Sequence, residues 1–229
     1  MDFAALVSGG KDSLYAAYLM CEQGWSLKGF VSVVPEKPYS YMFHSINLDV
    51  VGYQAQAAKV PNRRISVSGE KEREVDEFSE QLSHVMRDWG LDSFVTGAVR
   101  SEYQRTRFDS VCERVGAKSF SPLWHKDETR LLREYFERGF RFMLSGTYTL
   151  GLDSKWVGRT LEMDDLEKLV DLSKRYGFSP IGEGGEYESL VTRCPLFYTE
   201  LEVKGQVRQK GYVSEYLVES VQLSGAGNQ

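Results

Sequence analysis

Apolar residues follow two different spacings along the first two thirds of the chain. Short apolar runs bounded by glycine or proline are typical of buried strands, whereas apolar positions three and four residues apart predict amphipathic helices. The predicted strands cover residues 3–7, 27–34, 64–67, 93–96 and 140–144, and the predicted helices cover residues 13–23, 48–59, 71–89, 102–115 and 127–138. Strands that alternate with helices of this length predict parallel β-α-β units and a doubly wound α/β sheet.

The pattern changes after about residue 124. A helix over residues 164–176 precedes a glycine-rich loop, and strands with partial alternation are predicted over residues 189–192, 199–209 and 212–223. We therefore expect an α/β domain over residues 1–123 and a smaller α+β lobe over residues 124–229, although no Pro/Ser/Gly-rich linker marks the boundary.

Composition narrows the class of protein. The 229 residues carry a formal net charge of −5, which provides no global basic surface for nucleic acid. The three cysteines, Cys21, Cys112 and Cys194, form no C-x-x-C pair, so a zinc knuckle or a redox pair is not expected and a reducing compartment is favoured. No apolar stretch approaches the length of a membrane span, and the first residues lack the pattern of a signal peptide. These features predict a cytoplasmic protein that binds neither membranes nor nucleic acid directly.

The segment Ser8–Ser13, with the sequence SGGKDS, lies between the first predicted strand and the first predicted helix. Gly9 and Gly10 permit positive φ angles and leave no Cβ in the way, so successive backbone N–H groups can turn toward one anion. The helix N-terminus adds partial positive charge, and the hydroxyls of Ser8 and Ser13 can donate further hydrogen bonds. We expect phosphate groups to bind here; a tight turn without a ligand is the alternative.

Two charged residues complete this loop. Lys11 either assists phosphate binding or points into solvent, and the pattern does not decide between them. Asp12 would repel phosphates unless a metal ion lay between them, so we expect Mg²⁺ to bridge Asp12 and the phosphates.

The loop does not fit the G-x-x-x-x-G-K-[ST] or G-x-G-x-x-G patterns. It resembles the PP-loop, S-G-G-x-D-S, of the N-type ATP pyrophosphatases. The resemblance implies a doubly wound domain of the HUP, or adenine-nucleotide alpha-hydrolase-like, type. It also implies ATP and Mg²⁺ as cofactors in a reaction that splits ATP into AMP and pyrophosphate while adenylating a substrate.

Further segments resemble the diphthine–ammonia ligases, in the short, archaeal-type form without extra C-terminal domains. The resemblance runs from Met1 to about Phe197, with two conservative departures, Asp109 for Glu and Ser189 for Thr. The matching segments are Gly97-Ala98-Val99 with Glu102-Tyr103-Gln104 and Arg107, Ser121-Pro122-Leu123-Trp124 with Asp127, Gly182–Glu188 (GEGGEYE), Ser40–His44 (SYMFH) and Trp156–Arg159 (WVGR).

This resemblance implies the last step of diphthamide synthesis. ATP would adenylate the carboxylate of diphthine, a modified histidine of translation elongation factor 2, and ammonia would displace AMP. Because no Cys/His glutaminase pair is present, free ammonium is the expected nitrogen source. A tRNA-modifying PP-loop ligase and a non-catalytic nucleotide-binding module are the rival hypotheses. The oligomeric state, monomer or homodimer, stays open.

Candidate site residues fall into two groups. The ATP-binding group comprises Ser8, Gly9, Gly10, Lys11, Asp12, Ser13, Gly97, Tyr103, Gln104 and Arg107, with Asp12 as the metal ligand. Tyr103 and Arg107 share a helix face, and Arg107 could clamp a phosphate or carboxylate, or form a surface salt bridge. Gly97 follows a strand and either contacts the ligand or makes a plain turn.

The substrate-binding group centres on an acidic, glycine-rich loop. It comprises His44, Trp124, Glu183, Gly184, Gly185, Glu186, Tyr187 and Glu188, and the catalytic candidates are Asp12, Glu183, Glu186 and Glu188. Carboxylates beside an aromatic ring can hold the trimethylammonium group of diphthine or orient ammonia. A solvated acidic loop is the alternative, and His44 and Trp124 could equally be structural.

Overall fold

The computed structural model describes residues 1–35, 47–70 and 73–225. The chain divides into two compact units. The first contains Met1–Ser8 and Asp12–Trp124, and the second contains Gly9–Lys11 and His125–Gln229. The short segment Gly9–Lys11 therefore groups with residues far away in the sequence, although both of its neighbours along the chain belong to the first unit.

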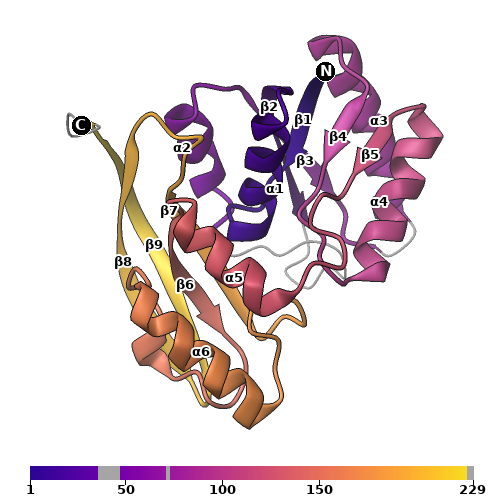
Figure 1. Ribbon diagram of the computed structural model, residues 1–229. Helices are drawn as coiled ribbons and strands as arrows, with labels where there is room; N and C mark the ends of the chain where they lie inside the picture. Colours follow the sequence, from indigo (N-terminus) through magenta and orange to yellow (C-terminus); the bar gives the residue numbers. More distant parts are fainter. Residues whose placement is uncertain (36–46, 71–72, 226–229) are drawn as a thin grey trace. The chain divides into compact units, whose positions relative to one another are not determined.

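The first unit is built on a five-stranded sheet with the order β3-β2-β1-β4-β5 (Figure 1). Every pairing in it is parallel, which confirms the doubly wound α/β fold. The strands are β1 (Asp2–Leu6), β2 (Ser26–Pro35), β3 (Asn62–Val67), β4 (Ser93–Val95) and β5 (Lys118–Phe120). β1 and β4 are neighbours near the centre of the sheet. β2 and β3 lie on the β1 side, and β5 lies on the β4 side.

In the described residues, four helices lie between these strands. They are α1 (Lys11–Glu22), α2 (Val50–Ala57), α3 (Arg73–Trp89) and α4 (Glu102–Val115). Val75, Phe78, Leu82 and Val85 of α3 are buried in one hydrophobic cluster that also contains residues of α4 and the sheet. The spacing of apolar residues over 71–89 therefore predicts the buried face of α3 correctly.

β5 has no counterpart among the predicted strands. It covers only three residues, and none of them is fully buried. A strand this short at the sheet edge carries no alternation long enough to distinguish it from a loop. Its Phe120 ring packs edge-on against Trp25, with 4.8 Å between the ring centroids.

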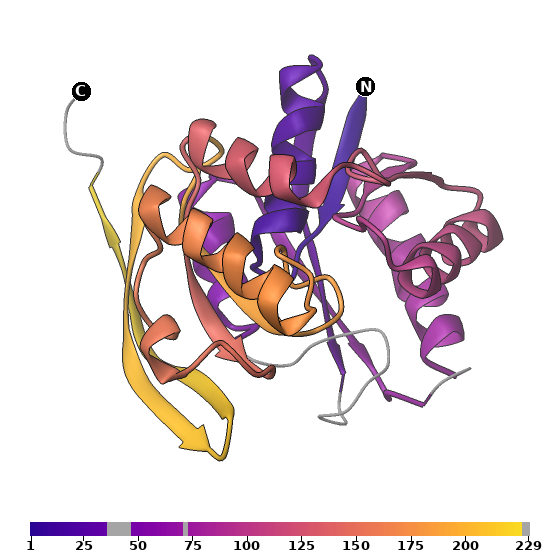
Figure 2. The same cartoon turned by 60° about the horizontal axis from the view of Figure 1, so that its bottom comes forward.

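The second unit contains a four-stranded sheet of order β7-β6-β9-β8, paired antiparallel throughout (Figure 2). Its elements are α5 (Glu128–Glu137), β6 (Arg141–Thr147), a 3-10 helix (Ser154–Trp156), α6 (Met163–Tyr176), β7 (Tyr187–Arg193), β8 (Glu200–Lys210) and β9 (Val213–Ser224). Asp127 caps α5 as predicted, because its carboxylate accepts a hydrogen bond from the Arg130 N–H at 2.8 Å. The strand predicted at 140–144 forms β6, which pairs antiparallel with β7 and β9.

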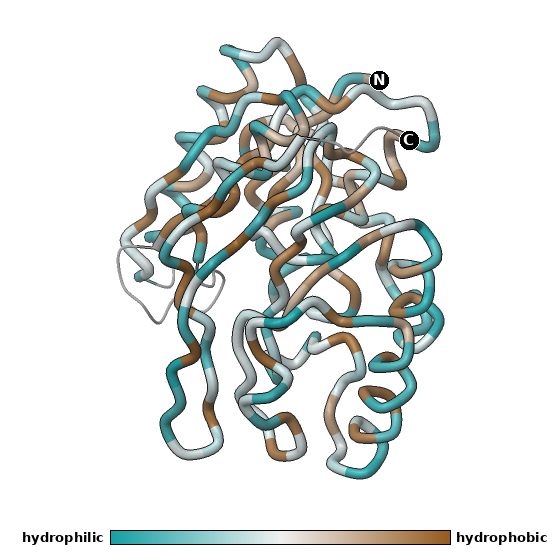
Figure 3. Tube along the Cα trace, turned by 90° about the vertical axis from the view of Figure 1, so that its left-hand side faces the viewer, coloured by the Kyte–Doolittle hydropathy of each residue, from teal (hydrophilic) through white to brown (hydrophobic). Residues whose placement is uncertain are grey.

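Aromatic side chains fill the core between α5 and β6. Tyr135 and Phe136 project from α5 onto Phe142 of β6, and the Phe136 and Phe142 ring centroids are 5.2 Å apart. In Figure 3, brown hydrophobic and teal hydrophilic segments alternate along the helices and strands, as expected for elements that bury one face. In the described part of the chain, no helix is long and apolar enough to cross a membrane.

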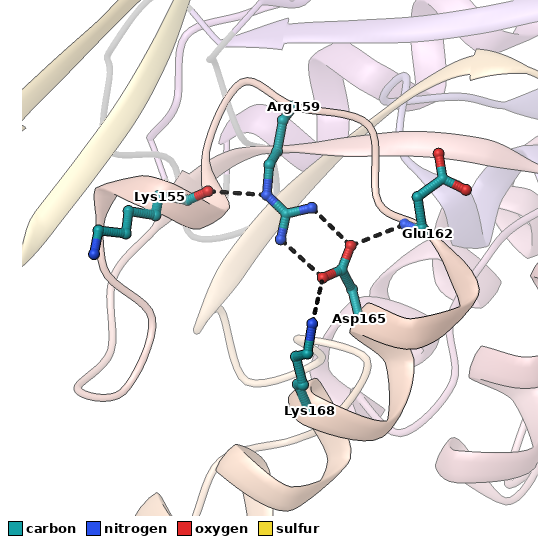
Figure 4. Close-up of polar contacts among 5 residues, drawn as sticks. All are labelled: Lys155, Arg159, Glu162, Asp165 and Lys168. Carbon is teal, nitrogen blue, oxygen red and sulfur yellow. Dashed lines mark hydrogen bonds and ion pairs between the residues drawn. The ribbon is translucent and has the colours of Figure 1, made fainter.

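The segment before α6 is fixed by an ion-pair network (Figure 4). Arg159 donates two hydrogen bonds to the Asp165 carboxylate, at 2.6 and 3.0 Å, and Lys168 lies 3.7 Å from the same group. Asp165 also accepts the Glu162 backbone N–H at 3.0 Å. These bonds, led by those from Arg159, lower the pKa of the Asp165 carboxyl to about 2. Arg159, one of the residues in the WVGR segment, therefore holds the start of α6.

Candidate active site

The loop Ser8–Ser13 leaves the carboxyl end of β1, next to the end of β4. Here the strand order of the first sheet reverses, and doubly wound sheets bind ligands at such a point. Gly9 has a φ of 90°, a conformation that glycine adopts without strain. α1 begins two residues later, so the N-terminus of this helix, with its partial positive charge, lies within the loop.

The side chains of the loop differ in exposure. Ser8 is exposed, Asp12 is half-buried and Ser13 is buried. Asp12 lies in the first turn of α1, where a carboxylate is favourable even without a metal. Among the described residues, no group of three or more His, Cys, Asp or Glu side chains could hold a metal ion. A magnesium site at Asp12 would therefore need ligand phosphates and water to complete it, as is usual for Mg²⁺.

Gly97 follows β4 and packs directly against the start of α1. A Cβ added at this position would lie 2.4 Å from the Ser13 backbone nitrogen and 2.6 Å from the Asp12 carbonyl carbon. Such distances are too short for any side chain, and the obstructing atoms are backbone. Gly97 therefore lets the first turn of α1 approach the end of β4. This close packing is a third explanation for the glycine, besides a ligand contact and a plain turn.

Lys11 neither points into solvent nor reaches along the loop. Its side chain is 2% exposed, and Nζ donates a hydrogen bond to the Ile181 carbonyl at 2.6 Å. Nζ also lies 5.0 Å from the centroid of the Tyr187 ring and 5.9 Å from that of Tyr135. Ring faces attract cations, most strongly where water is excluded. The Lys11 ammonium therefore sits in a buried aromatic environment within the second unit.

Two backbone hydrogen bonds attach the same segment to β7. The Lys11 N–H donates to Ser189 Oγ at 3.2 Å, and the Val191 N–H donates to the Gly9 carbonyl at 3.0 Å. Ser189 is one of the two departures from the family pattern, and threonine would offer the same hydroxyl acceptor. These contacts explain why Gly9–Lys11 group with the second unit.

The acidic loop Gly182–Glu188 begins one residue after the carbonyl that Lys11 binds. Within it, the Glu186 carboxylate turns back and accepts the Ser179 N–H at 3.1 Å and the Gly184 N–H at 2.9 Å. The Glu186 backbone carbonyl accepts the Tyr148 N–H at 2.8 Å. Glu186 therefore shapes the loop, whatever it contributes to a bound substrate.

Tyr187 is buried, and its hydroxyl donates to the Pro180 carbonyl at 2.7 Å. Its ring faces the Lys11 ammonium, as described above. Glu183 and Glu188 are half-buried, and Gly184 and Gly185 are exposed. The loop thus holds an aromatic ring and a cation together, but the cation belongs to the protein itself.

Tyr148 is a neighbour of this loop that the sequence patterns did not reveal. Burial raises the pKa of its phenol, and the negative charges of Glu188 and Glu215 raise it further. A neutral phenol in this position can donate a hydrogen bond at any physiological pH. A tyrosine just after a predicted strand was the available signal, but it has no distinctive spacing to the loop.

The candidates on α4 lie in the first unit. Arg107 stacks over the Tyr103 ring, with 4.7 Å between its guanidinium carbon and the ring centroid, so the two side chains share a helix face as predicted. The Gln104 N–H donates to the Ser101 side chain that caps α4. Trp124 packs under Arg105, 4.5 Å from its guanidinium carbon. His44 lies outside the described residues.

A doubly wound sheet with a glycine-rich loop and a helix N-terminus at its switch point is typical of nucleotide-binding proteins. Comparison with known families narrows this class. The family described as diphthamide synthase N-terminal domain matches residues 1–119, and the diphthamide synthase C-terminal domain family matches residues 127–220. The chain belongs to the diphthamide synthase family.

Named relatives agree with this assignment. A diphthine–ammonia ligase of Schizosaccharomyces pombe is 34% identical over 214 residues, which cover 86% of this chain and 35% of that protein. The diphthine–ammonia ligase of Homo sapiens is 32% identical over 223 residues, covering 89% of this chain and 83% of that protein. The chain thus spans about a third of the yeast relative's length and most of the human one's. The resemblance found from the sequence motifs is confirmed.

A solved structure titled as a predicted subunit of tRNA methyltransferase from Methanocaldococcus jannaschii has a TM-score of 0.43 and 16% identity, covering 85% of this chain and 98% of that one.

Proposed function

We propose that the chain is an AMP-forming ligase that amidates diphthine on translation elongation factor 2. In the first step a carboxylate oxygen of diphthine attacks the α-phosphorus of ATP, and pyrophosphate leaves. In the second step the nitrogen of ammonia attacks the acyl carbon, AMP leaves, and the nitrogen loses a proton. Family membership supports the reaction. The observation that carries the proposal to these residues is that Lys11 of the loop Ser8–Ser13 bonds to Ile181 and Ser189, the residues on either side of the acidic loop.

The loop Ser8–Ser13 suits the first step. Its glycine-permitted turn and the N-terminus of α1 offer fixed N–H dipoles to the charge of the departing pyrophosphate, and preorganised dipoles of this kind are a large part of catalysis. Asp12 would hold Mg²⁺ together with the ATP phosphates, and the ion would neutralise phosphate charge. On α4, Tyr103, Gln104 and Arg107 would contact the nucleotide.

The cysteines support ammonium as the nitrogen source. Burial raises the pKa of the Cys21 thiol and raises those of Cys112 and Cys194 to about 12. Glutamine hydrolysis by a cysteine needs a thiolate, which forms where the pKa is lowered. None of the three thiols meets that requirement.

The acidic loop is our candidate for recognising diphthine. We assign the trimethylammonium group, or the incoming ammonium, to the carboxylates of Glu183, Glu186 and Glu188. Tyr187, with its ring facing Lys11, holds the loop rather than forming an open surface for a ligand. We place the reaction in the cytoplasm, where translation takes place.

The decisive experiment measures pyrophosphate release from ATP by the purified chain. We expect release to depend on elongation factor 2 that carries diphthine and on ammonium, and the mass of the factor to change from that of the acid to that of the amide. Elongation factor 2 without diphthine is the matched control. Release that is stimulated by a tRNA transcript and not by the factor would establish the tRNA-modifying alternative. ATP binding without release under any of these conditions would favour a non-catalytic module.

A further inference from the structure

The outermost strand of the second sheet has an open edge. β8 is the terminal strand in the order β7-β6-β9-β8, and no strand of the described residues pairs with its outer side. Residues 206–212, at the end of the β8–β9 hairpin, are all exposed. Such an edge presents unpaired N–H and C=O groups and is a template for another strand.

β8 is also continuous along this edge. Its register with β9 shifts between Lys204 and Gly205, where the β9 partner changes from Ser220 to Val218. The extra residue of this irregularity, Glu219, is therefore on β9, and β8 runs without an insertion from Glu200 to Lys210.

β8 is acidic at its start and basic at its end. The sequence from Glu200 is E-L-E-V-K-G-Q-V-R-Q-K, so Glu200 and Glu202 come first, Lys204 lies next to the centre, and Arg208 and Lys210 come last. Within the chain, Glu200 also pairs with Arg193 at 2.9 Å. Two such strands that run antiparallel about Gly205 place Glu200 opposite Lys210 and Glu202 opposite Arg208. Opposite charges in directly opposed positions stabilise a strand pair, and like charges destabilise it.

The other face of β8 is complementary as well. The same antiparallel arrangement places Val203 opposite Val207, and these residues lie on the face opposite the charged ones because strand side chains alternate. Val207 is 45% exposed, although its partner on β9, Tyr216, is buried. Two copies would thus bring four valine side chains together next to the two glycines.

We propose that β8 is a homodimer interface, in which it pairs antiparallel with β8 of a second copy about a two-fold axis at Gly205. Glu202 then faces the partner's Arg208, and Glu200 faces the partner's Lys210. Each contact occurs twice, as two-fold symmetry requires. Edges that avoid association commonly carry inward-pointing charge, proline or a bulge on the edge strand; β8 instead carries charges that attract in the antiparallel arrangement and repel in a parallel one.

Sedimentation velocity of the full chain tests this interface. We expect the wild type to be a dimer, and E202R to be a monomer because the introduced guanidinium would face the partner's Arg208. E167R makes the same charge change on the exposed side of α6 and should remain a dimer. The triple variant E202R/R208E/E215R inverts the interface pair and also keeps the internal pair between positions 208 and 215, which is 2.5 Å long in the wild type; it should be a dimer again.

Disulfide formation tests the register. In V203C/V207C the cysteine at position 203 would face the cysteine at position 207 of the second copy. Oxidation should therefore give a covalent dimer on a non-reducing gel. V203C alone should not, because the two copies of position 203 would be far apart across the axis. A wild-type chain that stays monomeric at all concentrations would overturn the proposal. A dimer that persists in E202R, or equal cross-linking of V203C and V203C/V207C, would also overturn it.

Discussion

The two glycine-rich loops of this protein, Ser8–Ser13 and Gly182–Glu188, look alike in sequence but use their charged groups differently. In the first, the cation is turned inward: Lys11 is buried and binds the Ile181 carbonyl. In the second, a carboxylate is turned back onto the loop, where Glu186 accepts two backbone N–H groups. Each motif therefore contains some residues that fix the conformation of the loop and others that are available to bind a ligand. The sequence alone does not show which residue has which role.

The largest effect is expected at Asp12, the residue of the first loop that we propose as the Mg²⁺ ligand. D12N keeps the size of the side chain but removes the charge that would hold Mg²⁺. We expect pyrophosphate release to fall by roughly 10²-fold or more, the scale at which loss of one charge-stabilising group slows catalysis. Circular dichroism should show only a small fall in the melting temperature, because a favourable charge at the N-terminus of α1 is lost, and D171N on the exposed face of α6 should retain full activity. Wild-type release by D12N would remove Asp12 from the site.

The next largest effect is expected at Glu186. Its carboxylate fixes the conformation of the loop, and we propose that it also binds the substrate. E186Q loses one of two charge-assisted hydrogen bonds, because an amide nitrogen cannot accept an N–H. We expect amidation to be abolished while ATP still binds, as measured by mass of elongation factor 2 and by isothermal titration with ATP. E167Q, on the exposed side of α6, is the matched charge change and should retain amidation. Normal turnover by E186Q would refute a role for this carboxylate.

Lys11 belongs to the first loop but bonds to Ile181, next to the second. A substitution at this position therefore tests which of the two loops Lys11 serves. K11M keeps an unbranched side chain and removes the ammonium, so the Ile181 carbonyl loses a charge-assisted hydrogen bond. We expect kcat for amidation to fall about 10-fold, within the range for loss of one such bond. The dissociation constant for ATP should change less than kcat. An equal or larger weakening of ATP binding would show instead that Lys11 contacts the phosphates.

How much of this was readable from the sequence depends on how far apart the interacting residues are. The α-helices and most strands follow local apolar spacing, so their positions could be predicted. Among the described elements, the three-residue β5 and the 3-10 helix at Ser154–Trp156 were missed. The burial of Lys11 and its bond to Ile181 could not be predicted. The two residues are 170 positions apart, and a local sequence pattern contains no information about their contact. The same holds for Tyr148 beside Glu188 and for the antiparallel pairing of β6. The chemistry that the resemblance assigns to the two loops stays a prediction, and their geometry could not be predicted from local pattern.

Gly97 provides a test of how closely the first loop is supported. G97A would push a methyl group against the Ser13 backbone nitrogen, and we expect a loss of about 1–3 kcal/mol of stability, as for other overpacked sites. The KM for ATP should rise because the start of α1 is displaced. G52A in α2 is the control: a Cβ there meets no atom within 4 Å, so helix propensity should leave stability equal or higher. A G97A protein as stable as G52A would show that α1 can move without cost.

The smallest effect is expected outside both loops, at the ion pair between Arg159 and Asp165. Every interaction shown for Asp165 in Figure 4 is with the protein itself, so D165N should leave turnover unchanged and lower the free energy of unfolding by about 1–2 kcal/mol. The folded-state pKa of this carboxyl is about 2, below its ordinary value of 3.8. Its contribution is therefore fully present above pH 3.8 and is lost as the pH falls toward 2. Urea unfolding of both proteins should show a constant difference from neutral pH down to about pH 4 and a shrinking one below it. A loss of turnover in D165N would mean that the start of α6 supports the site, and that the WVGR segment carries more than structure.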